Sequence, residues 1–211
     1  MKILLRGLII FSATCFAFGL ATPMPSAQDS YDIVIEGGKT VDGTGNPWYY
    51  GDAGILNGRI VKIGELKKAG ARKRLDAANL VVVPGFVDIH TQTDTDIEKL
   101  PLAQNYIQQG VTTIVGGNGG DSIYPIGEKP AALERLGLGI NFALLAGQTT
   151  VRRQVIGIVD RSPTAGELKM MKGLVAKAIK EGALGISTGL YYAPGSYSKT
   201  DEVIELAKVA A

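Results

Sequence analysis

Short apolar runs alternate with helix-like segments through the second half of the chain, and this alternation is the strongest constraint on its fold. Apolar runs typical of buried parallel strands occupy residues 80–83, 111–115, 140–145 and 183–187. Helix-like segments follow these runs at 103–109, 130–136, 164–181 and from Thr200 onward. Strand–helix alternation predicts a parallel sheet with right-handed crossovers. The predicted fold class is therefore α/β, either an open doubly wound sheet or part of a (β/α)8 barrel.

The length of this region bears on the choice between the two architectures. A complete barrel takes about 250 residues, and residues 80–211 supply about half of that, or about four βα units. Four strands cannot close a barrel, so two sheet edges would remain unpaired. The last helix-like segment reaches Ala211 without a stop signal. We therefore expect an incomplete chain, and a half-barrel that dimerises through its edges remains an alternative.

The helix predicted after Thr164 has the clearest local signals. Thr164 and Glu167 have the spacing of a capping box, in which each residue satisfies a backbone N–H of the other. An apolar face then recurs at helical spacing through Leu168, Met171, Val175 and Ala178, and Gly182 ends the helix. Thr200 is expected to cap the last helix in the same way, with acidic residues in its first turn.

Residues 28–79 have the pattern of β structure. The segment Tyr31–Glu36 is rich in β-branched residues and ends at two glycines. The dipeptide Asn57-Gly58 lies between apolar runs at 54–56 and 59–63, which predicts a β-hairpin with a type I′ turn. We interpret this region as a small β-sandwich segment.

The N-terminus has the features of an export signal. Lys2 and Arg6 precede an apolar stretch over 7–21, and small residues follow up to Ala27, where we expect cleavage. An exported protein without residues 1–27 would lose Cys15, its single cysteine, and could form no disulfide. The net charge of +2 and the lack of a basic run argue against nucleic acid as a partner. After cleavage, no membrane partner is expected.

A candidate metal-binding segment runs from Pro84 to Asp96. His90 and Gln92 follow an apolar run and are two residues apart, a spacing that directs both side chains to one face of an extended segment. Imidazole is a good zinc ligand, whereas an amide oxygen is a weaker one. A hydrogen-bonded turn histidine is the alternative for His90. Asp94 and Asp96 either face the site or lie in a solvated loop.

Four segments resemble one enzyme family. Residues 84–94 (PGFVDIHTQTD) resemble the first metal motif of the amidohydrolase superfamily. Residues 110–120 (GVTTIVGGNGG), 146–152 (AGQTTVR) and 182–194 (GALGISTGLYYAP) resemble later segments of the N-acyl-D-amino-acid deacylases, or D-aminoacylases. The resemblance extends from about Tyr31 to the last residue. It implies a β-sandwich segment followed by the first half of a metal-dependent hydrolase barrel.

The resemblance also implies a function. Members of this family hydrolyse the amide bond of N-acyl-D-amino acids, usually with zinc, and so the expected partner is a small N-acyl amino acid. By resemblance His90 and Gln92 occupy metal-binding positions, and Tyr192 borders the substrate. Glycine stands at 119 where the family has a metal-binding cysteine, and glutamine stands at 148 where histidine is common. A degenerate member that binds a ligand or partner without turnover is the alternative.

Overall fold

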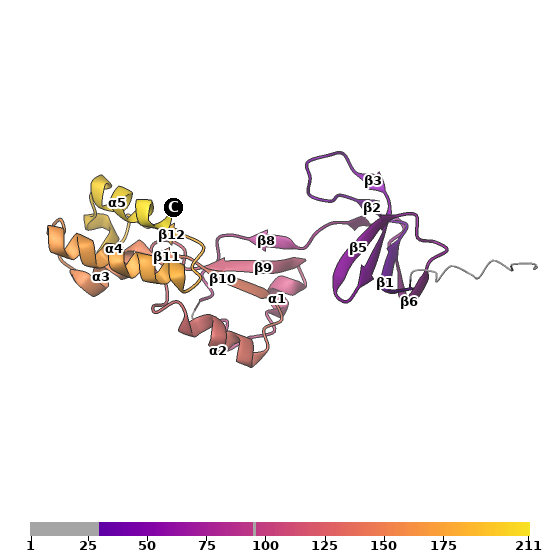
Figure 1. Ribbon diagram of the computed structural model, residues 1–211, viewed down its shortest axis with the longest axis horizontal. Helices are drawn as coiled ribbons and strands as arrows, with labels where there is room; N and C mark the ends of the chain where they lie inside the picture. The colour runs from indigo at the N-terminus through magenta and orange to yellow at the C-terminus, as the bar shows by residue number, and fades with distance from the viewer. Residues whose placement is uncertain (1–29, 95) are drawn as a thin grey trace, which may run out of the picture. The chain divides into compact units, whose positions relative to one another are not determined.

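The chain forms two compact units, which divide between Val83 and Pro84. The computed structural model describes residues 30–94 and 96–211 (Figure 1). The expected export signal at 1–27 lies outside the described residues. The domain limits inferred from the sequence, 28–79 and 80–211, stay predictions. Among the described residues, no helix is long and apolar enough to cross a membrane.

The described residues of the first unit, 30–83, form β-strands and no helix. Its larger sheet has the order β5-β4-β1-β6 and consists of β1 (Ser30–Glu36), β4 (Asp52–Leu56), β5 (Arg59–Gly64) and β6 (Gly70–Asp76). A second sheet has the order β3-β2-β7 and consists of β2 (Lys39–Thr40), β3 (Tyr49–Tyr50) and β7 (Val81–Val82). Tyr31, Val34 and Leu66 form the small buried core of the first unit.

The hairpin between β4 and β5 confirms the turn prediction. Asn57 and Gly58 have φ values of 52° and 71°, and Leu56 pairs with Arg59 across the turn. A type I′ turn needs positive φ at both central residues, which asparagine and glycine tolerate best. The local sequence alone therefore determines this connection.

The apolar run at 80–83 does not form the buried strand that we predicted. Within it, β7 pairs in parallel with β2 of the first unit, and the Val81 side chain is 58% exposed. Main-chain hydrogen bonds from Lys39 to Leu80 and from Val41 to Val82 fix this pairing. The apolar pattern showed that the segment is compatible with a strand, but it could not identify the partner strand.

The second unit is a mixture of parallel strands and helices. Its three-stranded sheet has the order β10-β9-β8, formed by β8 (Phe86–Asp88), β9 (Val111–Gly116) and β10 (Asn141–Leu144). The short strands β11 (Ala146–Gly147) and β12 (Ile186–Ser187) pair in parallel. The helical segments are α1 (Gln104–Ile107), α2 (Glu128–Leu136), α3 (Gln148–Val155), α4 (Ala165–Lys180), the 3-10 turn η1 (Gly195–Tyr197) and α5 (Thr200–Ala210). The α/β class is thus confirmed.

Helix α4 begins as its sequence predicts. The Thr164 hydroxyl accepts a hydrogen bond from the Glu167 N–H, and the Glu167 carboxylate accepts one from the Thr164 N–H. Met171 and Val175 are fully buried, in a cluster that also contains Val151 of α3 and Leu206 of α5. In Figure 1 these three helices lie together beside β11 and β12. Their packing positions the segments that follow both strands.

Two expectations for the helices were wrong or incomplete. Lys199, not Thr200, occupies the cap position of α5, and no side chain caps that helix. Helix α3 was not predicted. The buried face of this helix includes the polar side chains of Gln148 and Arg152, and so its sequence shows no continuous apolar stripe. Hydrophobic periodicity cannot detect a helix that buries polar side chains against polar partners.

Candidate functional site

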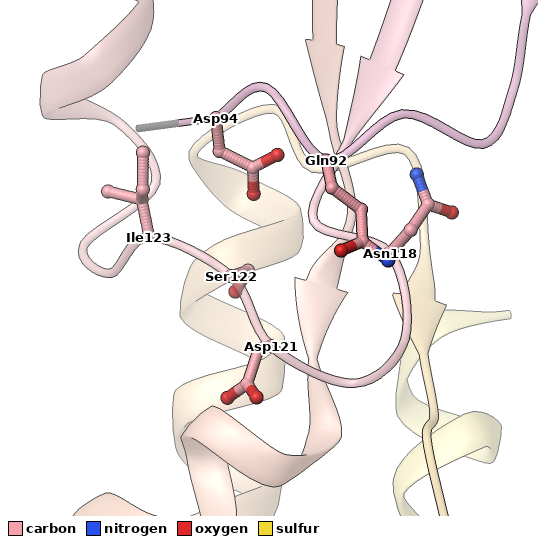
Figure 2. Close-up of a pocket in the computed structure, with 6 residues that line it drawn as sticks. All are labelled: Gln92, Asp94, Asn118, Asp121, Ser122 and Ile123. Atoms are coloured by element: carbon pink, nitrogen blue, oxygen red, sulfur yellow. The ribbon is translucent and has the colours of Figure 1, made fainter. Parts of the chain in front are cut away.

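A polar cavity of about 240 Å³ lies in the second unit, where the chain leaves β8 and β9. Six of the described residues line it: Gln92, Asp94, Asn118, Asp121, Ser122 and Ile123 (Figure 2). Figure 2 shows Gln92 and Asp94 on the segment after β8, opposite the loop that carries the other four. The carboxyl ends of parallel strands are where α/β proteins place their ligand sites. This cavity is therefore the candidate active site.

Hydrogen bonds join the segment after β8 to the end of β9. The main-chain N–H of Thr91 and its hydroxyl both donate to the Val115 carbonyl, at 3.2 and 2.9 Å. The Asn118 side-chain amide donates to the carbonyls of Thr91 and Val115, at 3.1 and 2.7 Å. Protein groups alone thus fix the backbone that forms one wall of the cavity.

Asp94 carries one paired and one unpaired carboxylate oxygen in this wall. Its Oδ2 accepts a hydrogen bond from the Gly117 N–H at 2.7 Å. Its Oδ1 is buried and has no hydrogen-bond partner among the described residues. Burial raises the pKa of the Asp94 carboxyl above its ordinary value of 3.8, and the bond from Gly117 opposes that shift. The sequence left two alternatives for Asp94, a place in the site or a place in a solvated loop, and in the structure Asp94 lines the cavity.

Glycines after β9 and after β12 allow neighbouring loops to approach closely. A Cβ at Gly117 would lie 2.2 Å from the Leu145 carbonyl oxygen, and one at Gly189 would lie 1.8 Å from the Gly119 carbonyl oxygen. The Ser187 hydroxyl donates to the Gly117 carbonyl and accepts a hydrogen bond from the Gly120 N–H. These glycines therefore serve loop packing next to the cavity.

The three residues predicted from the sequence do not gather around the cavity. Gln92 lines it, but His90 is an exposed residue outside the lining set. The His90 main-chain N–H donates to the Asp88 side chain. Tyr192 is 70% exposed, is also outside the lining set, and makes an edge contact with Tyr191 at 4.9 Å between ring centroids. Their functional roles stay predictions.

The described residues do not form a zinc site. No three histidine, cysteine, aspartate or glutamate side chains in 30–94 and 96–211 are placed to hold one metal ion. The chain has a single histidine, whereas tight zinc sites take about three or four protein ligands. A Cβ at Gly119 would meet no atom within 4 Å, so there is space for a side chain there but no ligand.

A second polar cluster lies buried between α3 and α5, and no pattern in the sequence indicated it. The Arg152 guanidinium pairs with Glu202 and also donates to the carbonyls of Val159 and Arg161. The Gln148 side-chain amide donates to the Ser198 hydroxyl at 2.6 Å and to Glu202 at 2.9 Å. Arg152 is fully buried, so it is a structural group of this unit.

Comparison with known proteins shows what the chain is similar to. It is 34% identical to the D-aminoacylase of Alcaligenes xylosoxydans xylosoxydans, over 87% of this chain and 43% of that protein. A crystal structure of N-acyl-D-glutamate deacylase from Bordetella bronchiseptica, complexed with zinc and a phosphonate mimic of the tetrahedral intermediate, superimposes with a TM-score of 0.82. That match has 34% identity and covers 86% of this chain and 43% of the other. No family model matches the chain.

A crystal structure of D-aminoacylase, which defines a subset of the amidohydrolases, superimposes with a TM-score of 0.78. That match has 33% identity and covers 85% of this chain and 43% of the other. The mixed α/β fold and the sequence identity make the chain an amidohydrolase-superfamily member. Within that superfamily it belongs to the family of D-aminoacylases and N-acyl-D-amino-acid deacylases. It spans less than half the length of these relatives.

Proposed function

We propose that this protein hydrolyses the amide bond of N-acyl-D-amino acids. The observation that carries the proposal is the polar cavity at the carboxyl ends of β8 and β9, in a chain 34% identical to a deacylase solved with a mimic of its reaction intermediate. The cavity is bounded by amide, carboxylate and hydroxyl groups, which suit a small polar substrate. The substrate is therefore a small N-acyl amino acid.

We also propose how the chain is built for this role. Residues 28–79 would form a β-sandwich segment, and residues 80–211 would form about four βα units of a (β/α)8 barrel. The parallel pairing of β8, β9 and β10 supports the barrel assignment. Export through a signal at residues 1–27 is part of the same proposal, and N-terminal sequencing of the mature protein tests it.

Zinc is the metal that we propose for the hydrolase, because the Bordetella relative was solved with zinc. A bound metal ion polarises the amide carbonyl and activates water. His90 is the one residue of this chain with a zinc-binding imidazole. A tight site therefore requires more ligands than the described residues bring together.

The test is a deacylase assay on the full-length protein, purified without its leader. N-acetyl-D-glutamate and N-acetyl-D-methionine serve as substrates, their L-enantiomers as controls, and zinc content is measured on the same samples. We expect release of free D-amino acids that increases with zinc occupancy. If no N-acyl-D-amino acid is hydrolysed at any zinc concentration, the proposed activity is wrong.

A second candidate is a family member that binds the same ligands without turnover. The observation that favours it is that glutamine stands at 92 and glycine at 119, where the resemblance places metal-binding residues. Isothermal titration separates the two candidates. Binding of N-acetyl-D-glutamate with no zinc and no product would identify the non-catalytic form, whereas stoichiometric zinc with turnover would exclude it.

A further inference from the structure

We infer that Gln148 is a positioning residue for the proposed reaction, because it holds the loop at residues 189–195 beside the candidate cavity. The inference rests on the proposed function, since this loop carries Tyr192, whose place next to the substrate is a prediction. Gln148 itself is fully buried and lies outside the set of residues that line the cavity. It would therefore act on the substrate only through the loop.

The loop at residues 189–195 has closely packed ends and an exposed tip. Tyr191 and Tyr192 at the tip are 85% and 70% exposed. Gly195 is buried, and a Cβ there would lie 2.5 Å from the Gly189 carbonyl oxygen, so the two ends of the loop are in close contact. Compact surface loops whose ends meet in this way are frequently functional.

The first end of the loop packs against the wall of the cavity. A Cβ at Gly189 would lie 1.8 Å from the carbonyl oxygen of Gly119, which directly follows the lining residue Asn118. In the strand before the loop, the Ser187 hydroxyl accepts a hydrogen bond from the Gly120 N–H at 3.1 Å. The loop is thus adjacent to the segment that lines the cavity.

Gln148 holds the segment that follows the loop. Its side-chain NH₂ group donates to the Ser198 hydroxyl at 2.6 Å and to Glu202 at 2.9 Å. Its Oε1 has no partner among the described residues, so these are the bonds that its side chain contributes there. Gln148 begins α3 directly after Gly147, whose N–H donates to the cavity-lining Ser122 at 2.8 Å. One residue therefore connects the cavity wall with the far end of the loop.

The neighbours of Gln148 stay paired with one another when its side-chain amide is removed. Glu202 keeps its ion pair with Arg152. The Ser198 hydroxyl keeps a hydrogen bond to Glu202 at 3.0 Å. Loss of the amide therefore loosens the connection between α3 and the segment after the loop. The expected consequence is local opening of the loop, whereas a purely structural role would affect the whole unit.

Chymotrypsin, which cleaves after tyrosine and phenylalanine, measures this opening. A protease binds an extended segment, so cleavage after Tyr191 or Tyr192 requires the ends of the loop to separate, and its rate follows the population of the open loop. Gln148→Met keeps a similar side-chain volume and removes the hydrogen bonds. We expect cleavage in the loop to become about three- to tenfold faster, which is the effect of one neutral hydrogen bond. Cleavage after Phe142 in β10, assigned by mass spectrometry, measures unfolding of the whole unit.

Val151→Ala is the matched control on the same helix. Val151 is fully buried and packs with Met171 and Leu206, outside the polar cluster. This variant should accelerate cleavage after Phe142 and leave cleavage in the loop close to its wild-type rate. The positioning role is refuted if Gln148→Met leaves cleavage in the loop unchanged, or accelerates it no more than cleavage after Phe142.

Kinetics connect the loop to the substrate. In the deacylase assay, Gln148→Met should raise KM for N-acetyl-D-glutamate by a similar factor and leave kcat unchanged, because the loop would contact the bound substrate and not the reacting bond. Faster cleavage in the loop with an unchanged KM would overturn the link to the substrate while the proposed activity stands. If the wild type hydrolyses no N-acyl-D-amino acid, the proposed activity fails, and the rate of cleavage in the loop still decides whether Gln148 positions it.

Discussion

Replacing Arg152 with methionine should destabilise the second unit strongly. The Arg152 side chain has no exposed surface, and its partner Glu202 is 2% exposed. Methionine fills a similar volume but leaves a buried carboxylate with only the neutral donors of Gln148 and Ser198. Breaking a buried ion pair by removing one partner costs about 3–5 kcal/mol. We expect a loss within that range in the free energy of unfolding.

A matched control is available on the same helix. Arg153 pairs with Asp121 at 2.9 Å, but the two side chains are 43% and 58% exposed. Water screens such a pair, so Arg153→Met should cost no more than about 1 kcal/mol. Each substitution removes one guanidinium from α3. The difference between their losses in the free energy of unfolding therefore measures the effect of burial on the ion pair.

Urea unfolding followed by circular dichroism at 222 nm is the assay. All helices of the described residues lie in the second unit, and the helical signal therefore follows that unit. Trp48, the single tryptophan, lies in the first unit and gives a separate fluorescence signal. Arg152→Met should shift the transition at 222 nm and leave the fluorescence transition unchanged. If Arg152→Met and Arg153→Met lower stability equally, the reasoning from burial is refuted.

Three further predictions concern the cap of α4 and the glycine loop. Thr164→Ala should lower stability by about 1 kcal/mol in urea unfolding, because an N-cap hydrogen bond is lost. Arg161 and the cap hold the pKa of Glu167 at about 2, below its ordinary 4.5. The free energy of unfolding of the wild type should therefore exceed that of Glu167→Gln above pH 4.5, and this difference should be lost as pH falls toward 2. A constant difference over that range would contradict this. Gly117→Ala should lower the melting temperature more than Gly119→Ala, since both have positive φ but only Gly117 has a main-chain oxygen 2.2 Å from the added Cβ.

Elements that depend on local chemistry were predictable from the sequence. Asn57-Gly58 required a particular turn, and the residues from Thr164 to Glu167 formed the cap that their spacing predicted. In each case the signal and its physical cause lie within about four residues of each other, as hairpin turns and caps require. Gln92 lines the candidate cavity, but the strand before it is β8 and not the run at 80–83 that we predicted, and its metal-binding role stays a prediction.

Features that depend on distant partners were not predictable. Residues 80–83 have a strand pattern, yet only their pairing with β2 decides to which unit they belong. Arg152 and Glu202 are 50 positions apart in sequence, and nothing in the sequence around either residue indicates that they form a buried ion pair. The same holds for Asp94, which follows β8. Its hydrogen-bond partner, Gly117, and the glycine packed against it, Gly116, lie at the end of β9. Each of these depends on long-range packing, which hydrophobic periodicity does not encode.

The residues that shape the candidate site are distinct from those that would perform its chemistry. Asn118, Ser187 and the loop glycines hold the backbone through hydrogen bonds and close contacts, and these interactions need no metal ion. Of the metal-binding positions that the resemblance places at 90, 92 and 119, only 90 carries a zinc-binding side chain, because 92 and 119 carry glutamine and glycine. A site can thus keep the backbone of its family while its ligand set changes, since the two depend on different side chains. Fold similarity therefore establishes the family, and only zinc content and turnover can establish the activity.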